Sequence, residues 1–255
     1  GCNNCCLFDI GSVLKGGFEM SNVEYTEPKT VLSALQVIGD ITLVATAQQF
    51  GGFTLPELDK VLLPYVLKSE AAALEKFRQM GVADDVAREF AVKETVRELE
   101  QGFQSLELKL NTVPCSRGDF AFTTITFGQW KPENYTASER EWLSTISRTM
   151  LRVRKKGHGR HGKPVVFPKL VYLYDRDQIA NDKPSAELFD EALRTSAECM
   201  YPDYLSLSSE SGSVSQIYQR YGAITSPMGC RAFLSPWFER GGMGPADEND
   251  KPVFV

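Results

Sequence analysis

A cysteine near the carboxyl end of the chain stands in a sequence context that favours a presented thiol. Cys230 lies within "SPMGCRAF", directly after Gly229 and directly before Arg231. Pro and Gly mark turns, whereas a buried cysteine behaves as a small apolar residue among apolar neighbours. The cation of Arg231 favours a thiolate or orients an anion. We therefore expect Cys230 on a projecting turn, with a buried structural thiol as the alternative.

The remaining cysteines form neither a disulfide scaffold nor a complete metal site; they are Cys2, Cys5, Cys6, Cys115 and Cys199. Disulfide scaffolds pack their bridges into a short chain. The Cys2–Cys5 pair has the spacing of zinc ligands, but no second pair completes a tetrahedral site. We therefore expect reduced thiols and no metal. Alternation along the apolar first strand sends Cys5 and Cys6 to opposite sides.

A polar loop precedes a predicted strand at "VPCSRGDFAFTT", where Ser116, Arg117, Gly118 and Asp119 follow one another. Free backbone N–H groups beside an arginine suit a phosphate or another polar ligand, although a plain turn is equally favoured. The two histidines stand in a loop rich in Gly, Lys and Arg, where solvated side chains are typical, and we assign them no catalytic role.

Composition excludes several classes of protein. The 255 residues are 42% hydrophobic and 24% charged, which is ordinary for a globular protein. A net charge of −5 argues against a nucleic-acid partner, which would need a basic surface. No stretch approaches the roughly 20 apolar residues of a membrane span, and no signal peptide is visible, so we expect a cytoplasmic protein. The ends do not look like natural termini, and we expect a fragment.

The first half of the chain is predicted to be mainly helical. A short apolar strand at "CCLFDI" is followed by an apolar helix from Lys29 to Phe50, which ends at a Gly pair. Residues 56–109 are rich in Glu, Lys, Arg, Ala and Leu, which predicts two amphipathic helices. Their break lies near Gly81, where Asp84 or Asp85 is a candidate N-cap.

The second half alternates strands with helices. The expected elements are a strand over 120–128, a helix over 138–157, a strand over 163–175 that Pro168 interrupts, a helix that ends before Pro202, and a polar loop over 206–216. Ser138 and Glu141 fit a capping box. Strands spaced by helices predict an α/β fold with a parallel or barrel-like sheet.

Several of these segments resemble one family, the anaerobic (class III) ribonucleoside-triphosphate reductases. The resemblance rests on "SPMGCRAFLSPW", "GKPVVFPKLVYLYD", "CMYPDY" and "NCCLFDIGSVLKGGF", and it extends over essentially the whole chain. It implies a glycyl-radical enzyme whose catalytic domain is a ten-stranded α/β barrel, of which this chain would hold about half, with long helices outside. The implied reaction is the reduction of ribonucleoside triphosphates to 2′-deoxyribonucleoside triphosphates.

The resemblance assigns roles to individual residues. Cys230 matches the cysteine that becomes a thiyl radical, and Cys5 matches the second active-site thiol, with Cys6 as the runner-up. Substrate contacts are implied for Ser116, Arg117 and Gly118 in the polar loop, and for Met228 and Gly229 beside Cys230. The family uses formate as the reductant, although a branch uses small dithiol proteins, and Cys115 and Cys199 leave that option open.

The resemblance also implies partners and missing parts. We expect ATP and deoxynucleotides as effectors at the helix from Lys29 to Phe50 and the one after Pro64, a radical-SAM activating enzyme, and a homodimer. Residues 1–255 would form a single domain, with the first strand and long helices in 1–110 and the strand–helix units in 111–255. The ATP-cone and the glycyl-radical segment have no match here, so we expect these residues alone to be inactive.

Two other functions remain open at this point. One is a different glycyl-radical enzyme, such as a relative of the formate lyases or diol dehydratases, although "MGCRAFL" and "FPKL" speak against it. The other is a non-catalytic nucleotide-binding or assembly module, such as half of a split enzyme.

Overall fold

Short apolar segments along the chain pair into a five-stranded parallel sheet. The computed structural model describes residues 5–20, 22–115, 118–210, 212–221, 226–228 and 232–233. The strand order follows the sequence: β1 (Cys6–Leu7), β4 (Phe53–Leu55), β5 (Thr123–Phe127), β6 (Lys169–Tyr174) and β7 (Asp203–Ser206). Parallel neighbours require crossover connections, and helices supply them between successive strands.

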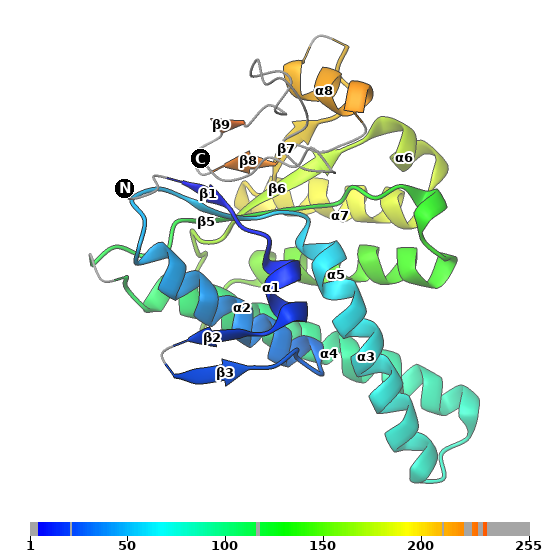
Figure 1. Cartoon of the computed structure of the whole chain (residues 1–255). Helices are drawn as coiled ribbons and strands as arrows, with labels where there is room; N and C mark the ends of the chain where they lie inside the picture. Colours follow the sequence, from blue (N-terminus) through cyan, green and yellow to red (C-terminus); the bar gives the residue numbers. More distant parts are fainter. Residues whose placement is uncertain are drawn as a thin grey trace.

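The helices lie mainly on one side of this sheet. They are α1 (Ile10–Gly16), α2 (Val31–Thr46), α3 (Leu58–Gln79), α4 (Asp84–Thr112), α5 (Ala137–Lys156), α6 (Arg176–Asn181), α7 (Lys183–Cys199) and α8 (Ser213–Tyr221), with a 3-10 turn at Pro132–Asn134. In Figure 1, α2, α4 and α5 lie below the sheet, and α3 and α4 project away from it as a helical hairpin. Among the described residues, no helix is both long and apolar enough to span a membrane.

Two small hairpins complete the described structure. Antiparallel β2 (Phe18–Met20) and β3 (Val23–Tyr25) lie beside the helices, and antiparallel β8 (Pro227–Met228) and β9 (Ala232–Phe233) lie above the sheet with α8 (Figure 1). A sequentially ordered parallel sheet with helices packed on one face is the arrangement of an α/β barrel wall rather than a doubly wound sheet. The prediction of an α/β fold is therefore confirmed.

Side-chain alternation gives the sheet two chemically different faces. Phe53, Leu55, Ile125 and Phe127 are fully buried in the core that the sheet shares with the helices. The intervening positions point the other way, toward the side that carries β8, and on β4 and β5 they are threonines: Thr54, Thr124 and Thr126. We call this second side the open face of the sheet.

Several element boundaries differ from the sequence prediction. The capping box of α5 is formed by Thr136 and Glu139, two residues before the predicted pair. The N-cap of α4 is Ala83 without a side-chain cap, while Asp84 lies in the first turn and pairs with Arg78 and Arg88.

Three further boundaries also differ. Pro64 lies inside α3 rather than before a helix. β6 begins at Lys169, after the Pro168 that was expected to interrupt it. The polar stretch over 206–216 already contains the start of α8, at Ser213.

A buried ion pair fixes the chain just before β6. Arg154 of α5 is 1% exposed and Glu107 of α4 is 3% exposed, and Arg154 Nε donates to Glu107 Oε1 at 2.7 Å. Arg154 Nη2 also donates to the carbonyl of Pro168 at 2.6 Å, and His158 Nε2 lies 2.8 Å from Glu107 Oε2. Asn111 holds both the N–H and the carbonyl of Phe167. The helical layer thus sets where β6 starts.

Replacing Glu107 with leucine should cost about 3–5 kcal/mol of stability, because it leaves the Arg154 guanidinium buried and without its partner. Urea unfolding of the wild type and Glu107→Leu measures this loss. Glu100→Leu is the matched control: it breaks an exposed α4–α5 pair with Lys156 and should cost no more than ~1 kcal/mol. Equal losses in the two variants would contradict the prediction.

Candidate active site

The adjacent thiols of the first strand have different surroundings. Cys6 is 5% exposed and lies in the helix-side core, where its Sγ donates to Gln49 Oε1 at 3.1 Å. Burial raises the pKa of Cys6 to about 11, and its hydrogen bond with Gln49 only partly opposes this shift. Cys5 is half-buried and, as the preceding residue of an extended segment, points to the opposite side. Cys6 is therefore a packing residue, and Cys5 is the presented thiol.

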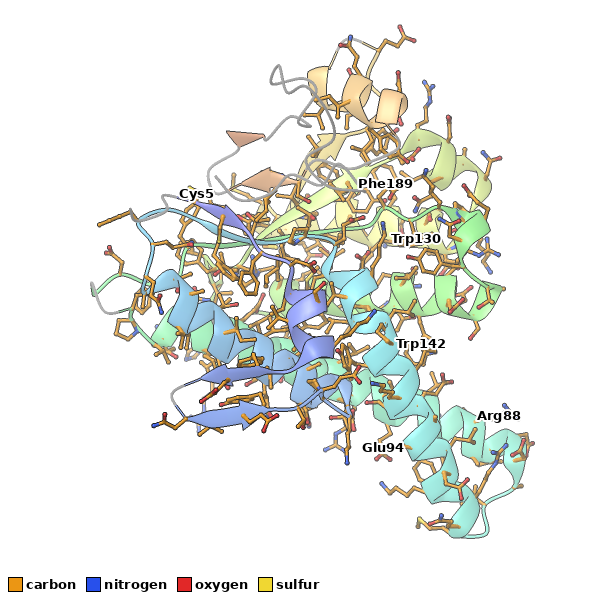
Figure 2. The ribbon with its side chains drawn as sticks, in the orientation of Figure 1. Cys5, Arg88, Glu94, Trp130, Trp142 and Phe189 are labelled. Carbon is orange, nitrogen blue, oxygen red and sulfur yellow. The ribbon has the colours of Figure 1, made fainter. Side chains whose placement is uncertain are left out.

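Cys5 lines a cavity of about 550 Å³ at the amino ends of the strands. Its Sγ accepts a hydrogen bond from the Gly52 N–H at 3.2 Å, just before β4, and Figure 2 shows Cys5 at the amino end of β1. The other lining residues lie mostly just before β4, β5 and β6; they are Thr46, Phe50, Gly51, Gly52, Cys115, Asp119, Phe120, Phe122 and Phe167. The cavity thus offers two thiols and a carboxylate among aromatic rings.

The chain that leads to Cys230 is fastened to the open face. Thr126 and Ser226 are hydrogen-bonded through their hydroxyls at 3.0 Å, and Thr54 Oγ1 donates to the carbonyl of Pro227 at 3.0 Å. Thr54 pairs in register with Thr124, which lies two residues before Thr126 on β5. Pro227, held by Thr54, therefore lies closer to the amino ends of the strands than Ser226, which Thr126 holds. From Ser226 to Pro227 the chain therefore runs toward the end of the sheet where Cys5 lies.

The residues proposed from the sequence fall partly inside the described structure. Cys230, Gly229, Ser116 and Arg117 lie outside the described residues. Gly118 is exposed with φ of +82°, and the next residue, Asp119, lines the Cys5 cavity. The backbone of Met228 belongs to β8 and pairs with Ala232. Asp119, at the end of the polar loop, and Cys5 therefore border one cavity.

The other candidate thiols lie in different places. Cys115 lines the Cys5 cavity and its Sγ is 3.3 Å from Thr46 Oγ1. Cys199 ends α7, where its Sγ donates to the carbonyl of Thr195 at 3.3 Å. Among the residues that the structure describes, no three of His, Cys, Asp and Glu are grouped to hold a metal ion.

A buried carboxylate shapes the carboxyl end of β5. Asp59, in the first turn of α3, is 1% exposed; its Oδ2 accepts the Gly128 N–H at 2.8 Å and faces Ser147 Oγ at 3.4 Å. Gly128 has φ of +98°, and an added Cβ would lie 2.6 Å from Tyr172 Cε2, so this position requires glycine. Burial raises the pKa of Asp59 to about 6, although the Gly128 hydrogen bond and Lys60 oppose the shift.

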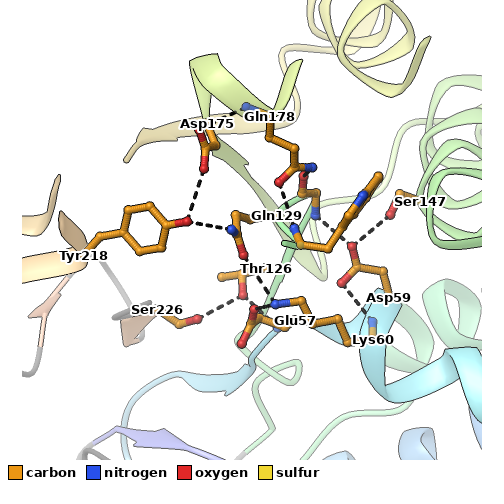
Figure 3. A network of polar contacts seen from close by, with 12 residues as sticks. Glu57, Asp59, Lys60, Thr126, Gln129, Ser147, Asp175, Gln178, Tyr218 and Ser226 are labelled. Carbon is orange, nitrogen blue, oxygen red and sulfur yellow. Dashed lines mark hydrogen bonds and ion pairs between the residues drawn. The ribbon is translucent and has the colours of Figure 1, made fainter. Parts of the chain in front are cut away.

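Polar contacts continue from Asp59 across the carboxyl ends of the strands (Figure 3). The next residue, Lys60, forms an ion pair with Glu57 and reaches Gln129 Oε1 at 3.4 Å. Gln129 Nε2 donates to the Tyr218 hydroxyl at 2.7 Å, and that hydroxyl donates to Asp175 Oδ2 at 3.2 Å. This network joins α3, β5, β6 and α8.

Sequence reasoning missed the threonines of the open face. Thr54 and Thr126 touch residues 173 and 100 positions away, so no local pattern reveals their partners. A signal is nonetheless present in "FTTITF", where Thr124 and Thr126 alternate with apolar side chains. Polar residues at every second position of a buried strand indicate a face turned away from the apolar core.

Comparison with known proteins gives one consistent result. The family model described as anaerobic ribonucleoside-triphosphate reductase matches residues 2–249. The anaerobic ribonucleoside-triphosphate reductase of Enterobacteria phage T4 is 33% identical over 236 residues, which are 92% of this chain and 36% of that protein. The Escherichia coli K12 protein of the same name is 32% identical over 94% of this chain and 31% of its own length. The chain thus spans about a third of the curated relatives that it matches.

The fold has solved counterparts. A crystal structure of the anaerobic ribonucleotide reductase from Thermotoga maritima, in complex with dATP and CTP, aligns with a TM-score of 0.54 and 16% identity. The alignment covers 82% of this chain and 34% of that one. At this identity the likeness speaks for the fold, and it is consistent with a sheet that forms part of an α/β barrel.

The two neighbouring thiols should react at very different rates. At pH 8, a thiol with a pKa of about 11 is ionised in only ~1 molecule in 1000, and Cys6 is also shielded by burial. Iodoacetamide should therefore alkylate Cys5 before Cys6, as mass spectrometry of the amino-terminal peptide would show. Cys5→Ser and Cys6→Ser identify the modified position. Faster labelling in Cys5→Ser than in Cys6→Ser would contradict the assignment of the presented thiol.

Asp59 should make the protein less stable as the pH rises. Its pKa is raised in the folded state, so between about pH 4 and pH 6 the folded protein holds a proton that the unfolded chain has lost. This contribution is full below about pH 4 and is lost as the pH passes about 6. We expect the free energy of unfolding, measured with urea, to fall between pH 4 and pH 7 by about 2–3 kcal/mol more in the wild type than in Asp59→Asn. The control variant Asp85→Asn, at an exposed position, should show the same pH dependence as the wild type. An equal loss of stability in the wild type and in Asp59→Asn would contradict the prediction.

Proposed function

The chain belongs to the family of anaerobic ribonucleoside-triphosphate reductases, and on this premise we propose that it supplies the thiols that reduce ribonucleoside triphosphates to 2′-deoxyribonucleoside triphosphates. The observation that carries the proposal is the course of the chain before Cys230. Ser226 and Pro227 are fastened to the open face and lead toward the end of the sheet where Cys5 is presented. We propose that Cys230, three residues after Pro227, meets Cys5 at this end of the sheet, because thiols on two different elements suit chemistry on both sides of a bound sugar.

In the proposed reaction, Cys230 and Cys5 have different tasks. Hydrogen-atom transfer from the Cys230 thiol to the family's glycyl radical, held on another segment, leaves a thiyl radical on Cys230. That sulfur takes the 3′-hydrogen atom of the ribose, after which the protonated 2′-hydroxyl leaves as water. Cys5 then donates a hydrogen atom to the 2′-carbon, which leaves a 3′-ketone and a thiyl radical on Cys5. One electron and one proton convert the ketone to a 3′-carbon radical, and Cys230 returns its hydrogen atom to that carbon.

Formate is the proposed source of the two electrons that the reduction requires. Formate gives its hydrogen atom to the Cys5 thiyl radical, and the remaining electron reduces the 3′-ketone as formate becomes carbon dioxide. The sum is ribonucleotide, formate and one proton to deoxyribonucleotide, carbon dioxide and water. The half-buried Cys5 lies beside a cavity wide enough to admit a small carboxylate. Dependence of turnover on formate, measured against a small dithiol protein as the alternative reductant, tests this part of the proposal.

The remaining assignments follow from the same premise. Ser116, Arg117 and Gly118, with Met228 and Gly229, are proposed to contact the nucleotide, and Asp119 beside them lines the cavity of Cys5. ATP and deoxynucleotide effectors are assigned to α2 and α3. Residues 1–255 are proposed to act as one domain of a cytoplasmic, homodimeric reductase that a radical-SAM enzyme activates, and to be inactive without the glycyl-radical segment.

Serine at either active-site thiol should abolish deoxynucleotide formation. A hydroxyl neither forms the needed radical nor donates a hydrogen atom as readily as a thiol, so Cys230→Ser and Cys5→Ser should fall to background in the reductase that contains this chain. The glycyl-radical signal, measured by electron paramagnetic resonance, should persist in both. Cys6→Ser and Cys199→Ser are the matched controls and should retain turnover. Appreciable turnover in Cys230→Ser would contradict the proposed chemistry.

A further inference from the structure

Two threonine hydroxyls on adjacent strands hold consecutive residues of the chain that leads to Cys230. Thr126 of β5 contacts Ser226, and Thr54 of β4 contacts Pro227, each at 3.0 Å. Thr54, Thr126 and Ser226 are all nearly inaccessible to solvent. Buried hydroxyls require partners, so these contacts are strongly preferred to any arrangement that leaves the hydroxyls empty.

The Pro227 contact fixes a residue with little freedom of its own. Proline has no backbone N–H and a fixed φ, so its carbonyl is its one backbone hydrogen-bonding group. That carbonyl accepts the hydrogen bond from Thr54 Oγ1. With Ser226 held by the neighbouring strand, two anchors act on successive residues from two strands. Such a pair restrains the direction of the chain as well as its position.

The Thr126 contact is connected to the helical frame. The backbone N–H of Glu57 donates to Thr126 Oγ1 at 2.9 Å, which occupies one lone pair and restricts how the hydroxyl can meet Ser226. Glu57 has a left-handed backbone with φ of +47°, and its side chain pairs with Lys60 in the first turn of α3. A non-glycine residue keeps this conformation only where its surroundings fix it. The anchor therefore rests on a rigid junction between β4 and α3.

The helix that precedes the anchored residues is tied to the same network. Tyr218 of α8 is held by Gln129 and Asp175, and Gln129 also accepts from Lys60 (Figure 3). Both sides of residues 222–225 are thus connected to one set of side chains at the carboxyl ends of the strands. This connection extends the restraint beyond a single pair of hydrogen bonds.

We propose that Thr54 and Thr126 are positioning residues that hold Ser226 and Pro227 on the sheet and act through them on the placement of Cys230. The inference rests on the proposed function, in which the Cys230 sulfur must meet both the stored radical and the 3′-hydrogen atom. Hydrogen-atom transfer needs near-contact geometry, and a misplacement of ~1 Å can cost roughly 100-fold in rate. Cys230 lies three residues after Pro227 in the sequence, so the anchors act through a short length of chain.

The test uses the complete reductase with its glycyl radical formed. Thr126→Val and Thr54→Val keep the shape of the side chain and remove the hydroxyl. We expect kcat for deoxynucleotide formation to fall by ~10- to 100-fold, with KM for the nucleotide and the glycyl-radical signal close to wild type. Thr126→Ser and Thr54→Ser restore the hydroxyl and should recover most of kcat.

A matched control and a double variant separate positioning from stability. Thr123→Val removes a buried hydroxyl from the helix side of the same strand, where it donates to the Ala121 carbonyl, and should leave kcat unchanged. Because Thr126 acts through Ser226, Thr126→Val combined with Ser226→Ala should be no slower than either single variant.

The outcomes distinguish this inference from the proposed function. An active wild type with unchanged kcat in Thr54→Val and Thr126→Val, or no recovery in the serine variants, would overturn the positioning role alone. A wild-type enzyme that carries the glycyl radical and forms no deoxynucleotide would overturn the proposed function and this inference together.

Discussion

The alternation of side chains along extended chain is the constraint on which the rest of this structure depends. It places Cys6 in the helix-side core and turns Cys5 away from it, although the two residues are neighbours in the sequence. The same rule applied to β5 sends Ile125 to the core and Thr126 to the open face. A shift of one residue in the pairing of either strand would exchange these roles, so the register of the sheet decides which groups are available for chemistry.

The register is in turn secured from the helical side. The large apolar side chains of β4, β5 and β6 pack into one continuous core with α2–α5, so a slip would expose several of them at once. Hydrogen bonds with buried polar side chains hold the backbone at two further positions. Asp59 holds the Gly128 turn after β5, and Arg154 holds Pro168 before β6. Asp59 therefore holds the carboxyl end of β5, and Arg154 holds the amino end of β6. Both lie in the helical layer, which leaves the open face free for other groups.

Much of this arrangement is visible in the sequence, and the remainder depends on contacts between distant segments. The long helices, the strand ending at Phe127 and the separation of Cys5 from Cys6 follow from local periodicity. The start of α5 did not, because "TASERE" contains two overlapping capping boxes, and the one that forms joins Thr136 to Glu139. The family resemblance directed attention to Cys230, but the anchoring of the preceding chain on β4 and β5 could not be inferred from residues so far apart.

The choice of threonine on the open face has a physical reason. Threonine nearly matches valine in shape and suits a strand equally well, so it keeps the packing of the sheet while adding a directional contact. Each such hydrogen bond adds only about 0.5–1.5 kcal/mol to net stability, far less than the core contributes. Two of them cannot determine whether the protein folds, but they strongly favour one placement of the chain over alternatives that leave buried hydroxyls unpaired. The open face of β4 and β5 thus contributes geometry, and the helical face contributes stability.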